Sequence, residues 1–543
     1  MKLISTRDPG ARVSFTQAVL ANLPGDGGLF APAELPRWPD VPDLLALGWQ
    51  ERSTEILDRL IGDEIARGEI ARIVRVAFDF PVPLVEVGGG DGGDAESGMK
   101  GGAGAAGAMG GTGEDAEVER FEAGAAEAVR AARAAAKPEK GAAGKIEPGV
   151  AEGPTFALEL FHGPSLAFKD FGARFLAEVL ARLDPGSRRT ILTATSGDTG
   201  AAVAAAFQGR PGVGVAILYP LGRVSPLQER QLACLGGNVR AFAVEGSFDD
   251  CQRMVKACFA DPELTAELGL TSANSINIAR LLAQVPYYFE ALAQLAGRRP
   301  GCRPVVAVPS GNFGNLCAGL YARALGLPVA AFVAATNANR TVPDYLDGGA
   351  YQGRPSVATM SNAMDVGDPS NWERIEHLLA PGARGAGAGS GAGSREGSEA
   401  SSGLGVGTSP GAGYGASFGA GYGPSPAVRS GTPREVLRSA LRWGSLDDRE
   451  TGEVLRSLWA RGYPADPHAA VACGVLARTR RPGETGIFLA TAHPAKFQTA
   501  LAGLGLEPTL PPALQALLGR PLRREVVPAD PALLKARLRS GSG

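Results

Sequence analysis

The chain has 543 residues, which is long enough for two or three domains with sizeable cores. Of these residues 44% are hydrophobic and 20% are charged, an ordinary composition for a globular protein. Its formal net charge of −2 argues against a nucleic-acid-binding surface and against strong attraction to acidic membranes. The N-terminus carries charges where a signal peptide needs an apolar run, and no charge-free apolar stretch is long enough to cross a membrane, so we expect a cytoplasmic protein. The cysteines show no metal-type spacing, and no pattern of His, Cys, Asp or Glu indicates a catalytic metal.

Two stretches differ in composition from the rest of the chain. Residues 88–152 are mostly Gly and Ala, and residues 382–432 are rich in Gly, Ser, Ala and Pro. Such segments bury too little apolar surface to offset their backbone entropy, so we expect both to be flexible insertions at the surface. They separate a mostly helical N-terminal region (1–87), a central α/β part (153–381) and a C-terminal part with a tail (433–543).

Outside these stretches, strand and helix patterns alternate. In the N-terminal region an amphipathic helical pattern covers residues 51–67. Short β-type runs with following helices come next: strands at 190–195, 213–218, 239–244, 305–309, 331–335 and 486–491, and helices at 201–207, 249–259, 281–292 and 316–325. Strands that lead through Gly-rich turns into helices predict an α/β fold with a parallel sheet. The tail after about residue 503 carries no motif that indicates a function.

Lys169 lies in a segment with closely spaced aromatic residues, just after the bend that Gly163 and Pro164 predict. A lysine amine in an apolar pocket can lose its proton and attack an aldehyde. The segment therefore has the character of a Schiff-base lysine that holds pyridoxal phosphate. Most lysines are solvated surface charges, and from this segment alone that alternative stays open.

Two Gly-rich turns lie between a predicted strand and a predicted helix. Residues 310–315 read Ser-Gly-Asn-Phe-Gly-Asn, and backbone N–H groups that converge at a helix N-terminus suit a phosphate. Residues 196–200 read Ser-Gly-Asp-Thr-Gly and suit a second anion, such as a substrate carboxylate. No Gly-Lys-Ser/Thr follows, so this is no Walker A loop. The alternative for both is an ordinary turn with helix capping.

A polar cluster precedes the helix predicted at 281–292. Asn277 and Arg280 lie one helical turn apart, near Asn274 and Ser275. A guanidinium beside an amide suits bidentate binding of phosphate, so we interpret the cluster as a site for the leaving phosphate of a substrate. The alternative is a helix cap with an exposed arginine.

In this order, these segments resemble the threonine synthase family, pyridoxal-phosphate enzymes of the tryptophan-synthase-like fold. Three further segments share the resemblance: residues 335–337, Ala-Thr-Asn, residues 361–366, Ser-Asn-Ala-Met-Asp-Val, and residues 491–494, Thr-Ala-His-Pro. The resemblance covers roughly residues 1–87, 153–381 and 433–500. It implies pyridoxal-phosphate-dependent fold type II, with two open, mostly parallel α/β sheets and a helical N-terminal region.

The resemblance also implies roles for single residues. Lys169 would hold the cofactor, and Thr491 would meet its pyridine nitrogen. The cofactor phosphate would be bound by Gly311, Asn312, Phe313, Gly314 and Asn315. The substrate would be bound by Ser196, Gly197, Asp198, Thr199, Ser275, Asn277 and Arg280.

The activity implied is conversion of O-phospho-L-homoserine and water to L-threonine and phosphate, a β,γ-replacement and the last step of threonine biosynthesis. One alternative is a related phospholyase that releases 2-oxobutanoate, and a threonine-dehydratase-like enzyme is a weaker match. A third alternative is a catalytically silent binding protein of the same fold. The sequence leaves the oligomeric state open between a monomer and a homodimer.

Overall fold

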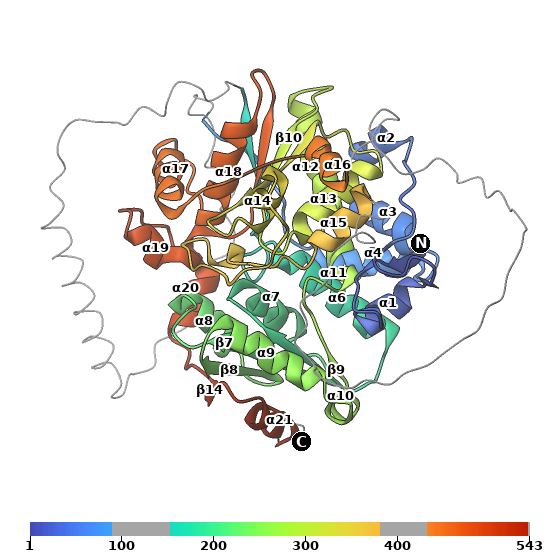
Figure 1. Cartoon of the computed structure of the whole chain (residues 1–543), viewed down its shortest axis with the longest axis vertical. Helices are drawn as coiled ribbons and strands as arrows, with labels where there is room; N and C mark the ends of the chain where they lie inside the picture. Colours follow the sequence, from blue (N-terminus) through green and yellow to red (C-terminus); the bar gives the residue numbers. More distant parts are fainter. Residues whose placement is uncertain (89–152, 381–431, 541–543) are drawn as a thin grey trace, which may run out of the picture. The chain divides into compact units, whose positions relative to one another are not determined.

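The computed structural model describes residues 1–88, 153–380 and 432–540 (Figure 1). The two Gly-rich stretches expected to be surface insertions, 88–152 and 382–432, lie almost wholly outside these residues. Within the described ranges, no helix combines the length and the apolar character that a membrane crossing requires. The described residues form two parallel sheets with helices on their faces, together with a smaller antiparallel sheet near the N-terminus.

The larger sheet has six strands, and only its edge strand β4 runs antiparallel to its neighbour. Val306 and Val308 face one side, in a core with helices α12 (Pro286–Arg298) and α13 (Gly314–Ala324). Val305 and Ala307 face the other side, toward α17 (Asp448–Ala460) and α18 (Pro467–Thr479). Burial of both faces explains why this strand is an unbroken apolar run. In spatial order the strands are β12 (Leu441–Ser445), β11 (Ala331–Thr336), β10 (Val305–Pro309), β13 (Gly486–Ala490), β5 (Thr155–Glu159) and β4 (Leu84–Glu86).

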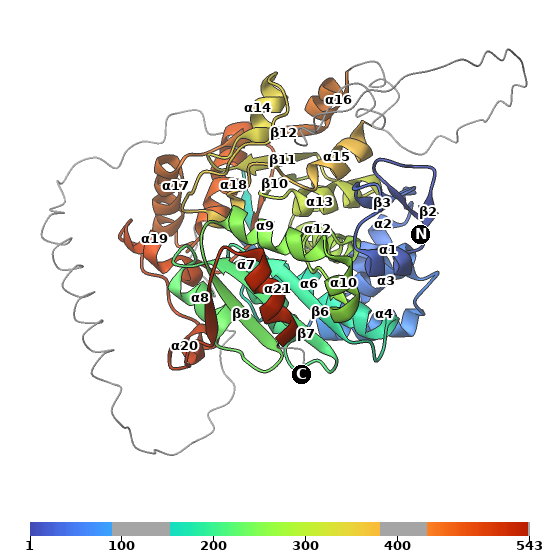
Figure 2. The same cartoon turned by 60° about the horizontal axis from the view of Figure 1, so that its bottom comes forward.

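The second sheet has five strands, all parallel. Val215 and Ile217 pack in the core that contains α6 (Lys169–Leu183) and α7 (Asp198–Phe207). Ala216 and Leu218 face the opposite side, toward α9 (Phe248–Phe259) and the C-terminal helix α21 (Pro531–Ser540), which packs on α9 (Figure 2). In spatial order the strands are β14 (Arg524–Pro528), β8 (Val239–Glu245), β7 (Val213–Pro220), β6 (Arg189–Ala194) and β9 (Leu270–Thr271).

The N-terminal region combines helices with a small antiparallel sheet, which the sequence patterns did not indicate. The helical pattern at 51–67 is divided between two helices, because α3 ends at Ile61 and α4 begins at Arg67. Helix α3 packs on α12, and α4 packs on α6, so this region covers the helices that surround the lysine segment. The elements are β1 (Leu3–Ser5), β2 (Arg12–Val13), α1 (Phe15–Ala21), β3 (Phe30–Pro32), α2 (Val41–Ala46), α3 (Trp49–Ile61) and α4 (Arg67–Ala77).

The prediction of a single helix at 281–292 is wrong. Helix α11 ends at Leu282, and α12 starts again at Pro286, because a proline lacks the N–H that a continuing helix needs. The tail after residue 503, where no motif was found, contributes β14 to the edge of the five-stranded sheet. The remaining elements are α8 (Pro226–Ala233), α10 (Pro262–Leu268), α11 (Ile278–Leu282), α14 (Thr341–Asp347), η1 (Asn362–Met364), α15 (Trp372–Leu379), α16 (Pro433–Ala440), η4 (Pro494–Phe497), α19 (Gln498–Ala502) and α20 (Pro512–Leu518).

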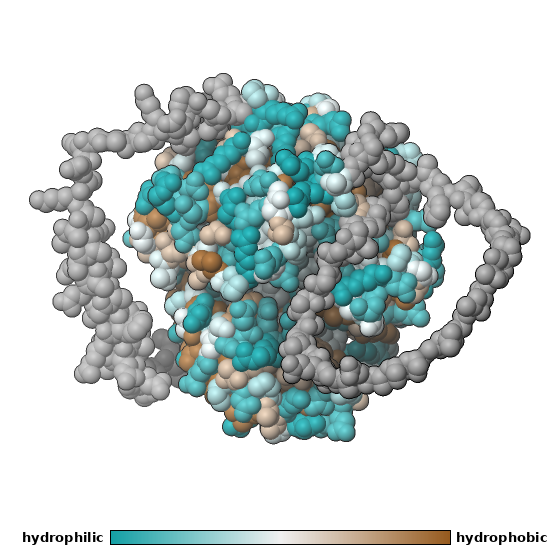
Figure 3. Space-filling view, viewed as in Figure 1, coloured by the Kyte–Doolittle hydropathy of each residue, from teal (hydrophilic) through white to brown (hydrophobic). Residues whose placement is uncertain are grey.

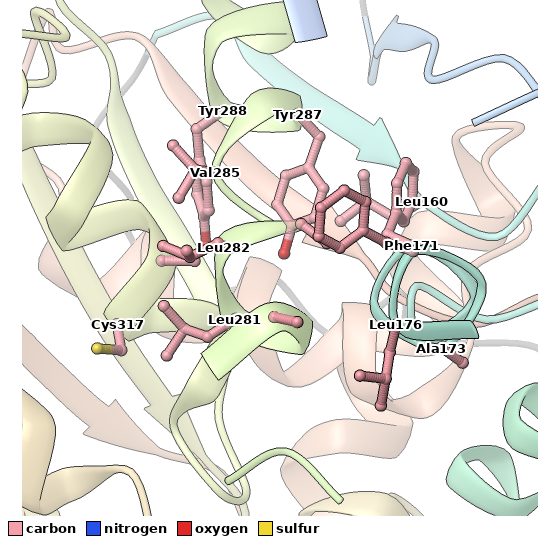
Figure 4. Close-up of a cluster of buried hydrophobic side chains, with 14 of the residues drawn as sticks. Leu160, Phe171, Ala173, Leu176, Leu281, Leu282, Val285, Tyr287, Tyr288 and Cys317 are labelled. Atoms are coloured by element: carbon pink, nitrogen blue, oxygen red, sulfur yellow. The ribbon is translucent and has the colours of Figure 1, made fainter. Parts of the chain in front are cut away.

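The predicted class, two open and mostly parallel α/β sheets, is confirmed by this arrangement. The predicted strands at 305–309 and 331–335 correspond to β10 and β11, and the helix at 249–259 corresponds to α9. The largest core runs between the sheets, where α6, α11 and α12 bury aromatic and aliphatic side chains against one another (Figure 4). On the coloured part of the face in Figure 3, hydrophilic residues predominate and hydrophobic ones are scattered.

Candidate active site

Lys169 is the first residue of α6, and its segment is tied to the segment that follows β13. Phe168 donates its backbone N–H to the carbonyl of Thr491 at 2.9 Å, and His493 donates its backbone N–H to the carbonyl of Leu166 at 3.0 Å. Strands β5 and β13 are parallel neighbours, so the segments that leave them meet at the carboxyl end of the sheet. In open α/β sheets this edge is where ligands bind.

The environment of Lys169 weakens its hold on a proton. Burial lowers the pKa of its amine to about 8, and the nearby cations Lys496 and Arg280 act in the same direction, while Asp198 opposes them. Partial positive charge at the N-terminus of α6 also disfavours the ammonium form. A substantial fraction of the amine is therefore neutral near physiological pH, and the neutral amine is the form that attacks an aldehyde.

The segment between β10 and α13 has the geometry of an anion cradle. Phe313 adopts a φ of 60°, in the left-handed region that residues other than glycine rarely enter. A Cβ atom on Gly311 would lie 2.7 Å from the carbonyl oxygen of Ala363, so this backbone path requires glycine. The segment ends at the N-terminus of α13, where unpaired N–H groups and the helix dipole favour negative charge.

Asn315, in the first turn of α13, offers a buried donor. Its Oδ1 accepts hydrogen bonds from the hydroxyls of Tyr287 at 2.5 Å and Tyr288 at 2.6 Å. These adjacent tyrosines lie at the start of α12 and are fully buried (Figure 4). The Asn315 Nδ2 is buried and has no hydrogen-bond partner among the described residues. An unsatisfied buried donor costs about 1–3 kcal/mol, so this amide fits an anionic ligand such as a phosphate oxygen.

The other predicted cofactor residues have these surroundings. The side-chain oxygen of Asn312 accepts a hydrogen bond from the hydroxyl of Ser370 at 3.3 Å. Gly314 begins α13, and a Cβ there would lie 3.3 Å from Nδ2 of Asn371. Thr491 is buried where β13 ends, next to the Lys169 segment. In the described residues, no group of three or more His, Cys, Asp or Glu side chains could hold a metal ion.

The Ser196–Thr199 segment precedes and opens α7. Its turn is closed by Thr195, whose Oγ1 accepts the backbone N–H groups of Gly197 at 3.0 Å and Gly200 at 2.9 Å. Gly197 has a φ of 134°, which a side chain would not tolerate. Ser196 and Thr199 are half-buried. The buried carboxylate of Asp198 is engaged within the protein, because its Oδ1 accepts a hydrogen bond from Nε2 of Gln228 at 3.0 Å.

The second partner of Asp198 is a lysine that the sequence interpretation did not single out. Nζ of Lys496, in η4, lies 2.7 Å from Oδ1 of Asp198, and both side chains are almost completely buried. The same ammonium donates to the carbonyl of Ser165 at 2.7 Å. The pKa of Asp198 lies far below its usual range, because Lys496 and Lys169 outweigh the effect of burial, which alone would raise it.

In the polar cluster before α11, Asn277 and Arg280 are buried, and Asn274 and Ser275 are half-buried. Asn277 caps α11 through the backbone N–H of Ala279, and its Nδ2 donates to the carbonyl of Val19 at 3.1 Å. Arg280 is 3% exposed, donates to a backbone carbonyl, and has an Nε without a hydrogen-bond partner among the described residues. Burial lowers the pKa of Arg280 to about 10, so it remains a cation at neutral pH. The side-chain oxygen of Ser275 accepts a hydrogen bond from Asn371 at 3.4 Å.

A lysine of lowered pKa, an anion cradle at the N-terminus of α13 and an unsatisfied Asn315 amide fit pyridoxal phosphate, with its aldehyde and its phosphate. The fold and this site therefore define a pyridoxal-phosphate-dependent enzyme, and a family model described as "Pyridoxal-phosphate dependent enzyme" matches residues 149–387. Models described as "Threonine synthase N terminus" and "Threonine synthase, C-terminal" match residues 2–78 and 469–537.

Individual proteins give the same result. A threonine synthase of Haemophilus influenzae is 40% identical over 539 residues, which are 99% of this chain and 99% of that protein. The crystal structure of threonine synthase from Escherichia coli is 39% identical, with a TM-score of 0.73 over 99% of this chain and 100% of that one. A pyridoxal-phosphate-bound threonine synthase from Brucella melitensis, 30% identical, also has a TM-score of 0.73, over 99% of each chain. The chain belongs to the threonine synthase family.

Proposed function

We propose that the substrate is O-phospho-L-homoserine, which the enzyme converts with water to L-threonine and phosphate. The observation that carries this proposal is Lys169, a lysine of lowered pKa at the carboxyl end of a parallel sheet, in a chain that matches threonine synthases over its full length. The reaction needs a reactive amine and binding groups for two phosphates, one that stays with the cofactor and one that leaves. The site offers the amine, the 310–315 cradle and the buried cation Arg280.

When bound, pyridoxal phosphate supplies an electron sink for negative charge that develops beside the amino-bearing carbon of the substrate. Lys169 would attach to the cofactor aldehyde. The amine of Lys169 would also take up and return protons at Cα and Cβ of the substrate. An amine with a pKa of about 8 suits this work, because both of its protonation states are populated near neutral pH. Gly311, Asn312, Phe313, Gly314 and Asn315 would bind the cofactor phosphate, and Thr491 would contact the pyridine nitrogen.

We assign the substrate phosphate to Arg280, which is a buried cation with an unpaired Nε, together with Ser275. We assign the substrate carboxylate to the Ser196–Thr199 segment, where the two hydroxyls are half-buried. Asp198 and Asn277 are engaged with protein groups, which supports a role in holding these segments rather than direct contact with the substrate.

We also propose that the enzyme works in the cytoplasm. All six cysteines are free thiols, and burial raises the pKa of Cys251 and Cys317 to about 12. Unpaired, unreactive thiols are usual in proteins of a reducing compartment.

The test is an assay of the purified, cofactor-loaded enzyme with O-phospho-L-homoserine, in which phosphate and amino-acid products are measured together. The proposal expects equal amounts of phosphate and threonine. It also expects no turnover in a Lys169→Ala variant and full turnover in Lys256→Ala, which removes an exposed lysine on α9. Phosphate with 2-oxobutanoate in place of threonine would identify a phospholyase. No product at all from the loaded enzyme would show that this substrate is wrong.

A further inference from the structure

Lys496 is a second lysine within the site, and it is completely buried. A buried ammonium needs partners, and Lys496 has two: the carboxylate of Asp198 and the carbonyl of Ser165, both at 2.7 Å. These partners belong to the two segments from which the site is built, because Asp198 opens α7 and Ser165 lies just before Lys169. Lys496 therefore joins the carboxyl ends of the two sheets.

Two lysines compete for one carboxylate here. Asp198 interacts electrostatically with both Lys169 and Lys496, yet its ion pair is with Lys496. Among the described residues, Lys169 forms no ion pair within 4 Å, and its Nζ lies 5.0 Å from the centroid of the Phe168 ring. Gln228 binds the same Oδ1 of Asp198 that Lys496 does, which fixes the carboxylate toward Lys496.

We propose that Lys496 is a positioning residue: its ion pair with Asp198 prevents that carboxylate from pairing with Lys169, and so leaves the Lys169 amine free to react. The inference rests on the proposed role of Lys169 as the cofactor lysine. A carboxylate paired with Lys169 would favour the ammonium form, which cannot attack an aldehyde. Loss of Lys496 would act twice in the same direction, because it removes a neighbouring cation and releases Asp198.

The other charged groups around Lys169 do not replace Lys496. Arg280, on α11, is a second cation that disfavours the ammonium form of Lys169, but it does not pair with Asp198 in the described residues. Asp466 favours the ammonium form of Lys169, and it is bound to the ring of His468 at 2.6 Å. Asp170, the next residue on α6, accepts a hydrogen bond from the backbone of Ser165.

The experiment measures the protonation of Lys169 in cofactor-free protein. Lysine amines are labelled briefly by an acylating reagent at a series of pH values, and the label on the Lys169 peptide is quantified by mass spectrometry. The wild-type midpoint should lie near pH 8. In Lys496→Met the midpoint should rise by about one to three pH units, because Asp198 then acts on Lys169 without the opposing charge of Lys496. Capture of pyridoxal phosphate at pH 7.5 should slow about tenfold for each unit of that rise.

The double variant Lys496→Met with Asp198→Asn provides the matched control. It removes both partners, so its midpoint should return to the wild-type value or fall below it. A merely structural role for Lys496 predicts no such recovery. An unchanged midpoint in Lys496→Met, or a raised midpoint that persists in the double variant, would overturn the proposal.

If Lys496→Met does not fold, Asp198→Asn and Lys496→Arg decide the question. The Asp198→Asn midpoint should fall, and the Lys496→Arg midpoint should stay near the wild-type value because the charge is kept. An Asp198→Asn midpoint equal to that of the wild type would overturn the proposal. Failure of the proposed role of Lys169 is recognised separately, because the cofactor would then be attached to a residue other than Lys169 in the wild-type enzyme.

Discussion

The backbone N–H of Phe168 donates to the backbone carbonyl of Thr491 at 2.9 Å, and the antiparallel bridge between Ala167 and Ala492 extends this contact. The segment of Lys169, the lysine that we propose holds the cofactor, is thus bound by main-chain hydrogen bonds to the segment that leaves the neighbouring strand β13. Main-chain bonds do not depend on side-chain identity, so the hydroxyl of Thr491 can be changed without loss of this connection.

We therefore expect Thr491→Val to fold normally but to bind the cofactor more weakly. The substitution keeps the shape and the carbonyl of residue 491 and removes only the hydroxyl proposed to meet the pyridine nitrogen. Loss of one hydrogen bond of about 0.5–1.5 kcal/mol corresponds to an affinity lower by about two- to tenfold. Titration of cofactor-free protein with pyridoxal phosphate measures this. An unchanged affinity and absorbance spectrum would place the pyridine nitrogen elsewhere.

The two tyrosine hydroxyls on Asn315 predict a second effect on cofactor affinity. In Tyr288→Phe, Oδ1 of Asn315 keeps only the hydroxyl of Tyr287 as a donor, so the amide is held less firmly in the orientation in which we propose that Nδ2 binds the cofactor phosphate. We expect unfolding free energy to fall by about 1 kcal/mol and cofactor affinity to fall severalfold. Tyr219→Phe is the matched control, because its hydroxyl donates to Glu229 instead. A loss of affinity equal in both variants would contradict this role of Asn315.

Gly311→Ala tests the cradle directly. The added Cβ would lie 2.7 Å from the carbonyl oxygen of Ala363, so the backbone must move, at a cost of about 1–3 kcal/mol. We expect lower thermal stability and a large loss of cofactor binding. Gly297→Ala, on α12, meets no atom within 4 Å and should leave binding unchanged while stability rises by about 0.5–1 kcal/mol. Normal cofactor affinity in Gly311→Ala would show that this segment does not bind the phosphate.

His493 predicts how stability depends on pH. Burial lowers its pKa to about 4 in the folded protein, and His162 and Lys496 act in the same direction. In the unfolded chain His493 takes up its proton near pH 6.5. Above that pH the histidine is neutral in both states, and its full contribution to the free energy of unfolding is present. It is lost as the pH falls from about 6.5 to 4, by at most about 1.4 kcal/mol per pH unit.

Urea unfolding at pH 7.5 and pH 5 measures this dependence. In His493→Asn the loss of stability between the two pH values should be smaller than in the wild type, because one proton is no longer taken up on unfolding. An equal loss in the two proteins would show that His493 does not titrate in this range.

Most structural features that depend on a local sequence pattern were predicted correctly. The apolar run at 305–309 and the Gly-rich turn after it correspond to β10 and the cradle, because a buried parallel strand and a strand-to-helix turn both have local signatures. The order of motifs also indicated the family. The break before α12 was visible as Pro286, yet the apolar pattern on both sides of it suggested one helix.

Other features depend on contacts between distant segments. Lys496 follows the 491–494 motif closely, but a buried ion pair with Asp198 cannot be read from either segment alone. The same holds for the tyrosines that fix Asn315 and for β14, an edge strand whose partner β8 lies far away in the sequence. Arg280 was expected as a phosphate ligand or an exposed helix residue, and its deep burial follows only from the packing of α11 against α6.

The assignment of Lys169 as the cofactor lysine is tested most directly by borohydride reduction of the cofactor-loaded enzyme, followed by peptide mapping. Reduction fixes pyridoxal phosphate to the amine that holds it, so mass spectrometry identifies the residue. We expect the modification on Lys169 and no modification of Lys496, whose ammonium is held by Asp198. Modification of Lys496, or of any lysine other than Lys169, would contradict it.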